Sequence, residues 1–106
     1  MPKKSLEVLT ESMFYVLMAF WREEKCGAEV AAFVEEKTGG RFRLGPATLY
    51  TLLAKFEKEG YLSPSQVEGR KRTYRITPKG RAAYLEEVER LRRCLADAQS
   101  EGGFLP

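Results

Sequence analysis

Histidine is absent from these 106 residues, and cysteine is scarce. Without histidine the chain has no Ser–His or Cys–His pair, no imidazole general base and no histidine-ligated zinc. Its two cysteines, Cys26 and Cys94, lie far apart without the spacing of a metal site. We therefore expect no cofactor and no metal, and the sequence disfavours an enzyme.

Long apolar runs are also missing. The longest, residues 13–21, falls well short of the ~18 residues that a membrane span needs. No apolar segment of the signal-peptide kind follows the N-terminal lysines. We expect a cytoplasmic protein with reduced thiols and no membrane partner.

Acidic side chains are sparse in the middle of the chain. Residues 41–80 contain nine Lys or Arg and three Asp or Glu, whereas the segments on either side are each slightly negative. Concentrated positive charge is typical of a surface that binds a polyanion. The alternative is a solvated basic face without a partner.

Three amphipathic segments predict helices over residues 11–24, 28–37 and 46–59. Thr10 is a candidate cap of the first helix, which has an unusually wide apolar face, and Pro46 suits the first position of the third. The third helix has a single apolar stripe, and its opposite face carries hydroxyls and lysines. The stripe consists of Leu49, Leu52, Leu53 and Phe56, and the opposite face of Thr48, Thr51, Lys55 and Lys58.

A hairpin follows over residues 61–77, with a turn at Gly69–Arg70–Lys71. Pro64 in its first strand favours an edge or irregular position. Thr77 and Pro78 then predict the start of a long helix over residues 78–99, and residues 100–106 are predicted to be a flexible tail. We expect a mainly α-helical fold with a small β-hairpin, in which residues 1–80 form a winged helix-turn-helix region.

This order of elements suits DNA. The major groove admits one helix, whose outer side chains meet base edges, while a basic hairpin (the wing) neutralises phosphates alongside it. Tyr50 is ambiguous, because it could bond a phosphate or anchor the wing. The candidate DNA contacts are Ala47, Thr48, Tyr50, Thr51 and Lys55 on the helix, and Gly69, Arg70, Lys71, Arg72 and Tyr74 in the hairpin.

Three blocks of the sequence together resemble the PadR-like transcriptional regulators. Residues 44–62 are similar to that family's recognition helix, residues 69–80 to its wing, and residues 10–17 to its first helix. The resemblance implies a dimeric regulator of double-stranded DNA, usually a repressor that reads an inverted repeat. Members often have His-Gly-Tyr after the first helix, where this chain has Cys26-Gly27-Ala28, and some drug-binding members have a Trp on the last helix, which this chain lacks.

The last predicted helix favours a homodimer. Tyr84, Val88, Leu91 and Leu95 recur at alternating spacings of four and three residues, the seam of a coiled coil. The alternative is that this seam packs only on the chain's own first helix. Cys94 lies beside it, and an intersubunit disulfide there is a minor alternative to an inert thiol; Cys26 is interpreted as an inert turn residue.

Phe14 and Trp21 are weak candidates for binding a small-molecule effector, and the competing interpretation places both in the core. For the whole protein, the alternative to a DNA-binding regulator is a winged-helix module that contacts only other proteins. Three adjacent cations at the hairpin tip argue against that alternative, since protein docking does not require them.

Overall fold

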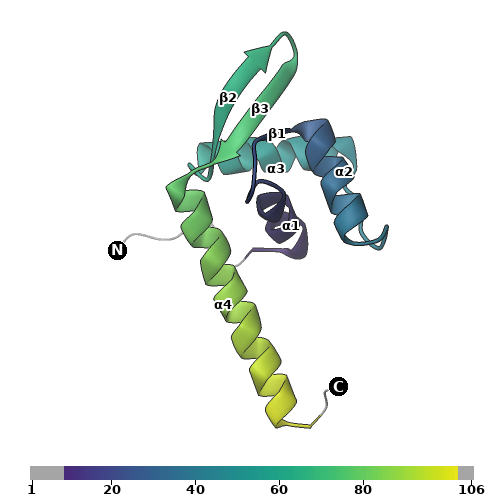
Figure 1. The fold of residues 1–106 in the computed structure, drawn as a ribbon, viewed down its shortest axis with the longest axis vertical. Coiled ribbons are helices and arrows are strands. Elements are labelled where there is room, and N and C mark those ends of the chain that lie inside the picture. Colours follow the sequence, from purple (N-terminus) through teal and green to yellow (C-terminus); the bar gives the residue numbers. More distant parts are fainter. Residues whose placement is uncertain (1–8, 103–106) are drawn as a thin grey trace.

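A computed structural model describes residues 9–102 of the chain. The elements follow in the order α1 (Glu11–Ala19), β1 (Lys25–Cys26), α2 (Gly27–Lys37), α3 (Pro46–Lys58), β2 (Leu62–Glu68), β3 (Lys71–Ile76) and α4 (Pro78–Ser100). The predicted fold class, mainly helical with a small hairpin and a long C-terminal helix, is confirmed. In Figure 1 the hairpin projects from one end of the molecule, and α4 runs away from the body at the other.

Local capping explains where three helices begin. The Thr10 hydroxyl accepts a hydrogen bond from the Met13 amide at 3.2 Å, and the Thr77 hydroxyl accepts one from the Gly80 amide at 3.0 Å. Pro46 and Pro78 occupy the first turns of α3 and α4, where a missing N–H leaves no helical bond unmade. These starts depend only on residues a few positions apart, so the sequence predicts them well.

Helix α1 is shorter than predicted, and the prediction that it reaches Glu24 is wrong. The helix ends at Ala19 with Phe20 as its cap. Phe20 is almost completely buried, and the chain then turns so that residues 25–26 meet the hairpin. The long-range contact thus overrides a helical pattern that continues in the sequence.

The hairpin belongs to a three-stranded sheet, in the order β1-β3-β2, that the sequence did not predict. Lys25 pairs with Tyr74 and Cys26 with Thr73, both antiparallel. Cys26 is therefore a buried strand residue and the cap of α2, which corrects its interpretation as a turn residue. Pro64 lies in the edge strand β2, beside an irregularity between Pro64 and Gln66, as its missing N–H predicted.

The core lies around α1, which sits at the centre of the molecule in Figure 1. Helices α2 and α4 contact α1, α3 contacts α2 and β2, and side chains from all of these elements join one buried cluster. Contacts with α2 and β2 bury one side of α3 and leave its other side exposed. The largest fully buried side chains are Phe20, Phe56, Leu17, Leu53, Leu62, Val16, Val30 and Val34.

The predicted flexible tail, residues 100–106, begins one residue too early, because Ser100 is the last residue of α4. Glu101 and Gly102 form a turn, and residues 103–106 lie outside the described part of the chain. Within residues 9–102, no helix has both the length and the apolar character of a membrane span.

Candidate nucleic-acid interface

Helix α3 has one buried and one exposed side. Leu49, Leu53 and Phe56 are buried in the core, at 3% exposure or less. The side chains predicted to contact DNA lie on the other side and are all exposed, and Tyr50 is 60% exposed. This side could enter a groove without disturbing the core. Its members are Ala47, Thr48, Tyr50, Thr51 and Lys55.

Tyr50 lies directly over the start of α2. A Cβ placed on Gly27 would be 3.0 Å from Tyr50 Cε1 and 3.1 Å from its hydroxyl oxygen. The close approach therefore depends on glycine at position 27. Nothing in the sequence alone identified this contact, because the two residues lie on different helices.

The hairpin turns at Gly69, whose φ of +62° is a conformation that favours glycine. The exposed side chains of Arg70, Lys71 and Arg72 follow at once. Arg72 Nη1 lies 3.4 Å from Oε1 of Glu57 on α3, so one wing cation contacts the recognition helix. The sequence alone does not predict this pairing either, because Arg72 and Glu57 lie in different elements.

Lys71 lies near the start of α2. The carboxylate of Glu29 accepts a hydrogen bond from the Cys26 amide at 2.8 Å, which lowers the pKa of Glu29, and the charge of Lys71 acts in the same direction. The wing tip, Tyr50 and the start of α2 enclose a cavity of about 550 Å³, lined among others by Gly27, Tyr50, Arg70, Lys71 and Arg72. Recognition helix and wing thus share one cationic surface.

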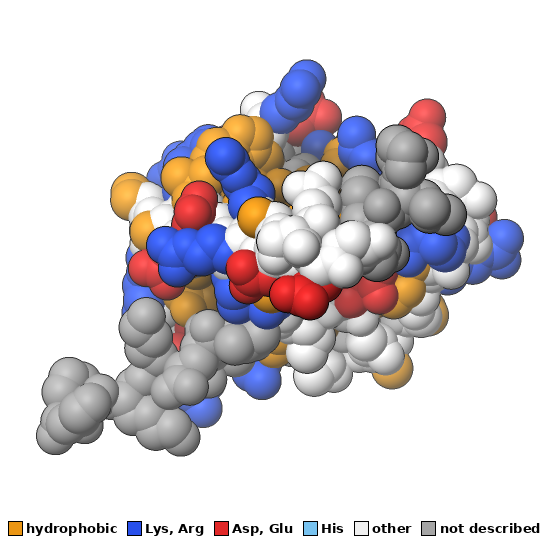
Figure 2. Space-filling view, turned by 90° about the horizontal axis from the view of Figure 1, so that it is seen from below, with side chains coloured by type: hydrophobic (Ala, Val, Ile, Leu, Met, Phe, Trp, Pro, Cys, Tyr) orange, Lys and Arg blue, Asp and Glu red, His pale blue; other side chains and the backbone are white. Residues whose placement is uncertain are grey.

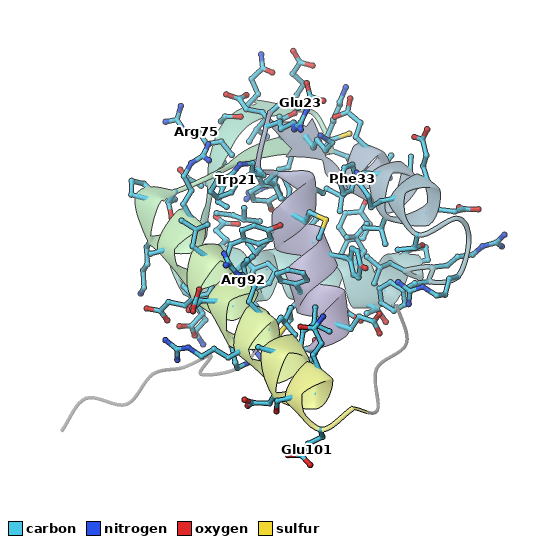
Figure 3. The ribbon with its side chains drawn as sticks, turned by 60° about the horizontal axis from the view of Figure 1, so that its bottom comes forward. Trp21, Glu23, Phe33, Arg75, Arg92 and Glu101 are labelled. Carbon is cyan, nitrogen blue, oxygen red and sulfur yellow. The ribbon has the colours of Figure 1, made fainter. Side chains whose placement is uncertain are left out.

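Two arginines in the segment between α2 and α3 are paired with carboxylates. Arg41 donates to Glu11 at 2.9 Å and to the Tyr15 hydroxyl at 3.2 Å, and the hydrogen bond with Glu11 raises the pKa of Arg41. Arg43 lies 3.3 Å from Glu35. Arg75 is exposed on the wing strand β3 and is labelled in Figure 3.

The seam predicted on α4 divides into two parts. Tyr84 stacks on Phe14 of the same chain, with ring centroids 5.0 Å apart, so here the seam packs on the chain's own first helix. Leu91 and Leu95 are 40% and 47% exposed, and Val88 is half-buried. Figure 2 looks at the molecule from below and shows hydrophobic side chains lying between charged ones.

The effector candidates pack partly on the core. Trp21 lies between α1 and α4 (Figure 3), 5.2 Å from the Tyr84 ring and under the Arg81 guanidinium at 4.5 Å. Beside it opens a groove of about 740 Å³, whose lining includes Trp21, Phe33 and Tyr84. Phe14 is half-buried and does not line this groove.

Both cysteines are free thiols. Cys26 is buried, and it lines the cavity beside the wing. Cys94 is exposed on α4, with Arg90 Nη1 3.8 Å from its sulfur.

Residues 16–86 match the model of the transcriptional regulator PadR-like family. This segment contains α2, α3, the whole sheet and the start of α4. The chain belongs to the PadR-like family. It is a transcriptional regulator and not an enzyme.

Relatives of this PadR-like chain agree with that assignment. It is 40% identical over 76 residues to the transcriptional regulator Rv3488 of Mycobacterium tuberculosis, across 66% of this chain and 71% of the relative. A transcriptional regulator from Clostridium thermocellum is 26% identical with a TM-score of 0.72, covering 89% of this chain and 92% of that one.

Bacillus subtilis PadR, solved in complex with operator DNA, shares the fold of this chain with a TM-score of 0.66. It is 18% identical, and the match covers 74% of this chain and 47% of that one. At this identity the likeness concerns the fold alone.

One residue of this PadR-like chain that was predicted to contact DNA lies in the core instead. Tyr74 is 6% exposed and belongs to the core, so the prediction that it contacts DNA is wrong. Because β3 is the central strand, Tyr74 is covered on both edges, and it alternates with Thr73 and Arg75 to share the inner face with Ile76. Period-two alternation alone does not say which of the two faces is buried.

Proposed function

We propose that this PadR-like chain binds double-stranded DNA in a sequence-specific manner. One observation carries the proposal: the exposed side of α3 and the cationic wing tip line one continuous surface, joined at the cavity beside Tyr50. In this arrangement Thr48 and Thr51 meet base edges, and Arg70 and Lys71 neutralise phosphates. The family assignment and the DNA-bound structure of Bacillus subtilis PadR support it.

We also propose a homodimer that represses transcription in the cytoplasm by occupying an inverted repeat. The support is the second half of α4, where Leu91 and Leu95 extend the seam beyond the chain's own core. Exposed leucines at coiled-coil spacing gain free energy when a second copy covers them. Two-fold symmetry then places two recognition helices on one side of the duplex.

The test is selection of bound duplexes from a random pool, using the purified chain. We expect enrichment of an inverted repeat whose half-sites lie about 10 base pairs apart, or a multiple of that spacing. A Thr48→Ala/Thr51→Ala variant should select a different or degenerate sequence, because it lacks the hydroxyls that meet base edges. Retention of the wild-type consensus by this variant would remove Thr48 and Thr51 from base recognition.

A chain that binds no duplex even at low ionic strength would contradict the proposal. That result would favour the alternative, a winged-helix module that contacts only other proteins. The wing supplies the matched control, since Arg70→Ala/Lys71→Ala should weaken binding to all sequences about equally and leave the selected consensus unchanged.

We further propose that a small molecule with both an aromatic or apolar part and charged groups releases the protein from DNA by binding in the groove beside Trp21, whose lining combines aromatic rings with charged side chains. The groove has room for such a ligand, and Tyr84 in its lining joins it to the helix of the proposed dimer. Trp21 is the single tryptophan, so its fluorescence reports directly on the groove. A ligand that changes this emission but leaves DNA affinity unaltered would contradict the release mechanism.

A further inference from the structure

The three adjacent cations of the wing are held differently. Arg72 forms an ion pair with Glu57 on α3, at 3.4 Å. Within residues 9–102, neither Arg70 nor Lys71 lies at salt-bridge distance from a carboxylate. Two wing cations therefore remain available to an external anion, and the third is already matched.

The geometry of β3 explains the difference. Arg72 alternates with Lys71 and Thr73, and so shares the face of the strand on which Tyr74 and Ile76 are buried. That face is turned toward the core and α3. The guanidinium of Arg72 consequently reaches Glu57 on the recognition helix, whereas Lys71 lies beside the start of α2, where it lines the cavity with Tyr50.

The acidic partner is unusual in its position. Glu57 is one of only three carboxylates among residues 41–80, the basic third of the chain, and it lies on the recognition helix itself. A carboxylate near a DNA-binding surface repels phosphate, so its presence there weakens binding unless another interaction that it makes favours binding. The ion pair between Glu57 and Arg72 joins the wing directly to α3, the two elements that must reach the duplex together.

We propose that Glu57 and Arg72 form a positioning pair that orients the wing relative to the recognition helix, and that Arg72 is not a phosphate contact. This inference rests on the proposed DNA binding. It narrows the wing's phosphate contacts to Arg70 and Lys71, and it assigns a role to Glu57. It also separates Arg72 from the two neighbours with which the sequence grouped it.

The experiment measures binding of a fluorescein-labelled mixed-sequence DNA duplex by anisotropy over a range of salt concentrations. A lost phosphate contact reduces the slope of log K against log salt by about 0.9, whereas a misplaced wing lowers affinity through geometry. The variants are Arg72→Gln, Glu57→Gln, the double variant, and Arg70→Gln and Lys71→Gln. Glu59→Gln is the matched control, because it removes a carboxylate close to the end of α3 that is not paired with the wing.

We expect Arg72→Gln and Glu57→Gln each to weaken binding about two- to fivefold, the range of an exposed ion pair, and to have equal salt slopes, because both changes break the same pair. The double variant should be no weaker than the worse single variant, because both changes break one interaction. Arg70→Gln and Lys71→Gln should each lower the slope by about 0.9. Glu59→Gln should bind as well as wild type or more tightly.

Two results would overturn the inference. A salt slope for Arg72→Gln that is about 0.9 lower than that of Glu57→Gln would make Arg72 a phosphate contact, and tighter binding by Glu57→Gln would mean that Glu57 acts only as a repulsive charge. Failure of the wild-type chain to bind any duplex is a separate outcome, which contradicts the proposed function itself. Thermal unfolding of each variant checks that the fold is intact, since both side chains are partly exposed.

Discussion

At the scale of single residues, Gly80 is required where α4 leaves the wing. A Cβ at this position would lie 2.3 Å from the Tyr61 carbonyl oxygen and 2.9 Å from Ile76 Cγ1. The first of these is a backbone atom, which cannot rotate out of the way. A change of side-chain rotamer therefore cannot remove this clash, and either α4 or the backbone at Tyr61, just before β2, must move.

We predict that Gly80→Ala lowers the free energy of unfolding by about 1–3 kcal/mol, the usual cost of overpacking. Urea unfolding followed by circular dichroism measures it. Gly45→Ala is the matched control, because nothing lies within 4 Å of its added Cβ and only a cap preference is lost, below about 1 kcal/mol. Equal stability of the two variants would refute the close packing at Gly80.

Glu87 is a second residue with a definite role, as a carboxylate only 5% exposed. The Arg90 guanidinium donates to both of its oxygens, and the Leu9 amide lies 3.5 Å from Oε1. The hydrogen bonds from Arg90, followed by that from Leu9, lower the pKa of Glu87. A pKa below the unfolded value means that ionised Glu87 stabilises the folded state.

This stabilisation is complete above the unfolded carboxyl pKa, about 4.3, and is lost as the pH falls through the lower folded value. We predict that Glu87→Gln lowers the free energy of unfolding by about 1–2 kcal/mol at neutral pH, and that its difference from wild type shrinks in acid. Urea titrations across the acid range measure this. Glu89→Gln, whose partner Arg93 is exposed, should change stability little at any pH.

At the scale of elements, the start of α2 and the recognition helix meet at one contact. Gly27 lets the Tyr50 ring lie against the first turn of α2. Because Tyr50 is exposed, its ring can rotate away from an added methyl group at little cost in stability. The consequence of a substitution should therefore appear in binding rather than in folding.

We predict that Gly27→Ala weakens DNA binding about two- to tenfold, with little change in melting temperature. The expected loss is that of one hydrogen bond between the displaced Tyr50 hydroxyl and DNA. Tyr50→Ala should have a similar effect. In the Tyr50→Ala background, Gly27→Ala should cause no further loss, because the displaced ring is already gone. Additive losses measured by anisotropy would show that Gly27 acts independently of Tyr50.

At the scale of the whole molecule, the described part of the chain leaves the side chains of the second half of α4 uncovered. The helix has 23 residues, and all side chains from position 91 to its end are exposed. Tyr84, by contrast, packs on Phe14. In Figure 1 the second half of α4 runs away from the body of the molecule, and the proposed homodimer would cover it with a second copy.

We predict that Leu91→Glu converts a dimer to monomers in sedimentation velocity, because charged side chains would face each other across the seam. The affinity for an inverted repeat should then fall at least about 100-fold, since two linked half-site contacts become one. Arg93→Glu is the control, as it introduces a carboxylate on the opposite side of the helix. A Leu91→Glu chain that remains dimeric would move the interface away from this seam.

The amino-acid sequence by itself determined the features that depend on near neighbours. The cap at Thr77, the proline-initiated start of α3, the amphipathic sides of α3 and the glycine turn of the wing all follow from residues within about one turn of each other. These local preferences can be read from the sequence because they involve near neighbours, although tertiary packing supplies most of the stability.

Only the tertiary structure decided what depends on distant partners. Four features depend on contacts between residues far apart in sequence. They are the end of α1 at Ala19, the pairing of β1 with β3, the burial of Tyr74 and the ion pair between Glu57 and Arg72. Periodicity shows that a strand has two faces but not which one the core covers, and composition shows cations but not which ones are already paired. Packing settles both, because burial and pairing are properties of the folded neighbourhood rather than of the local chain.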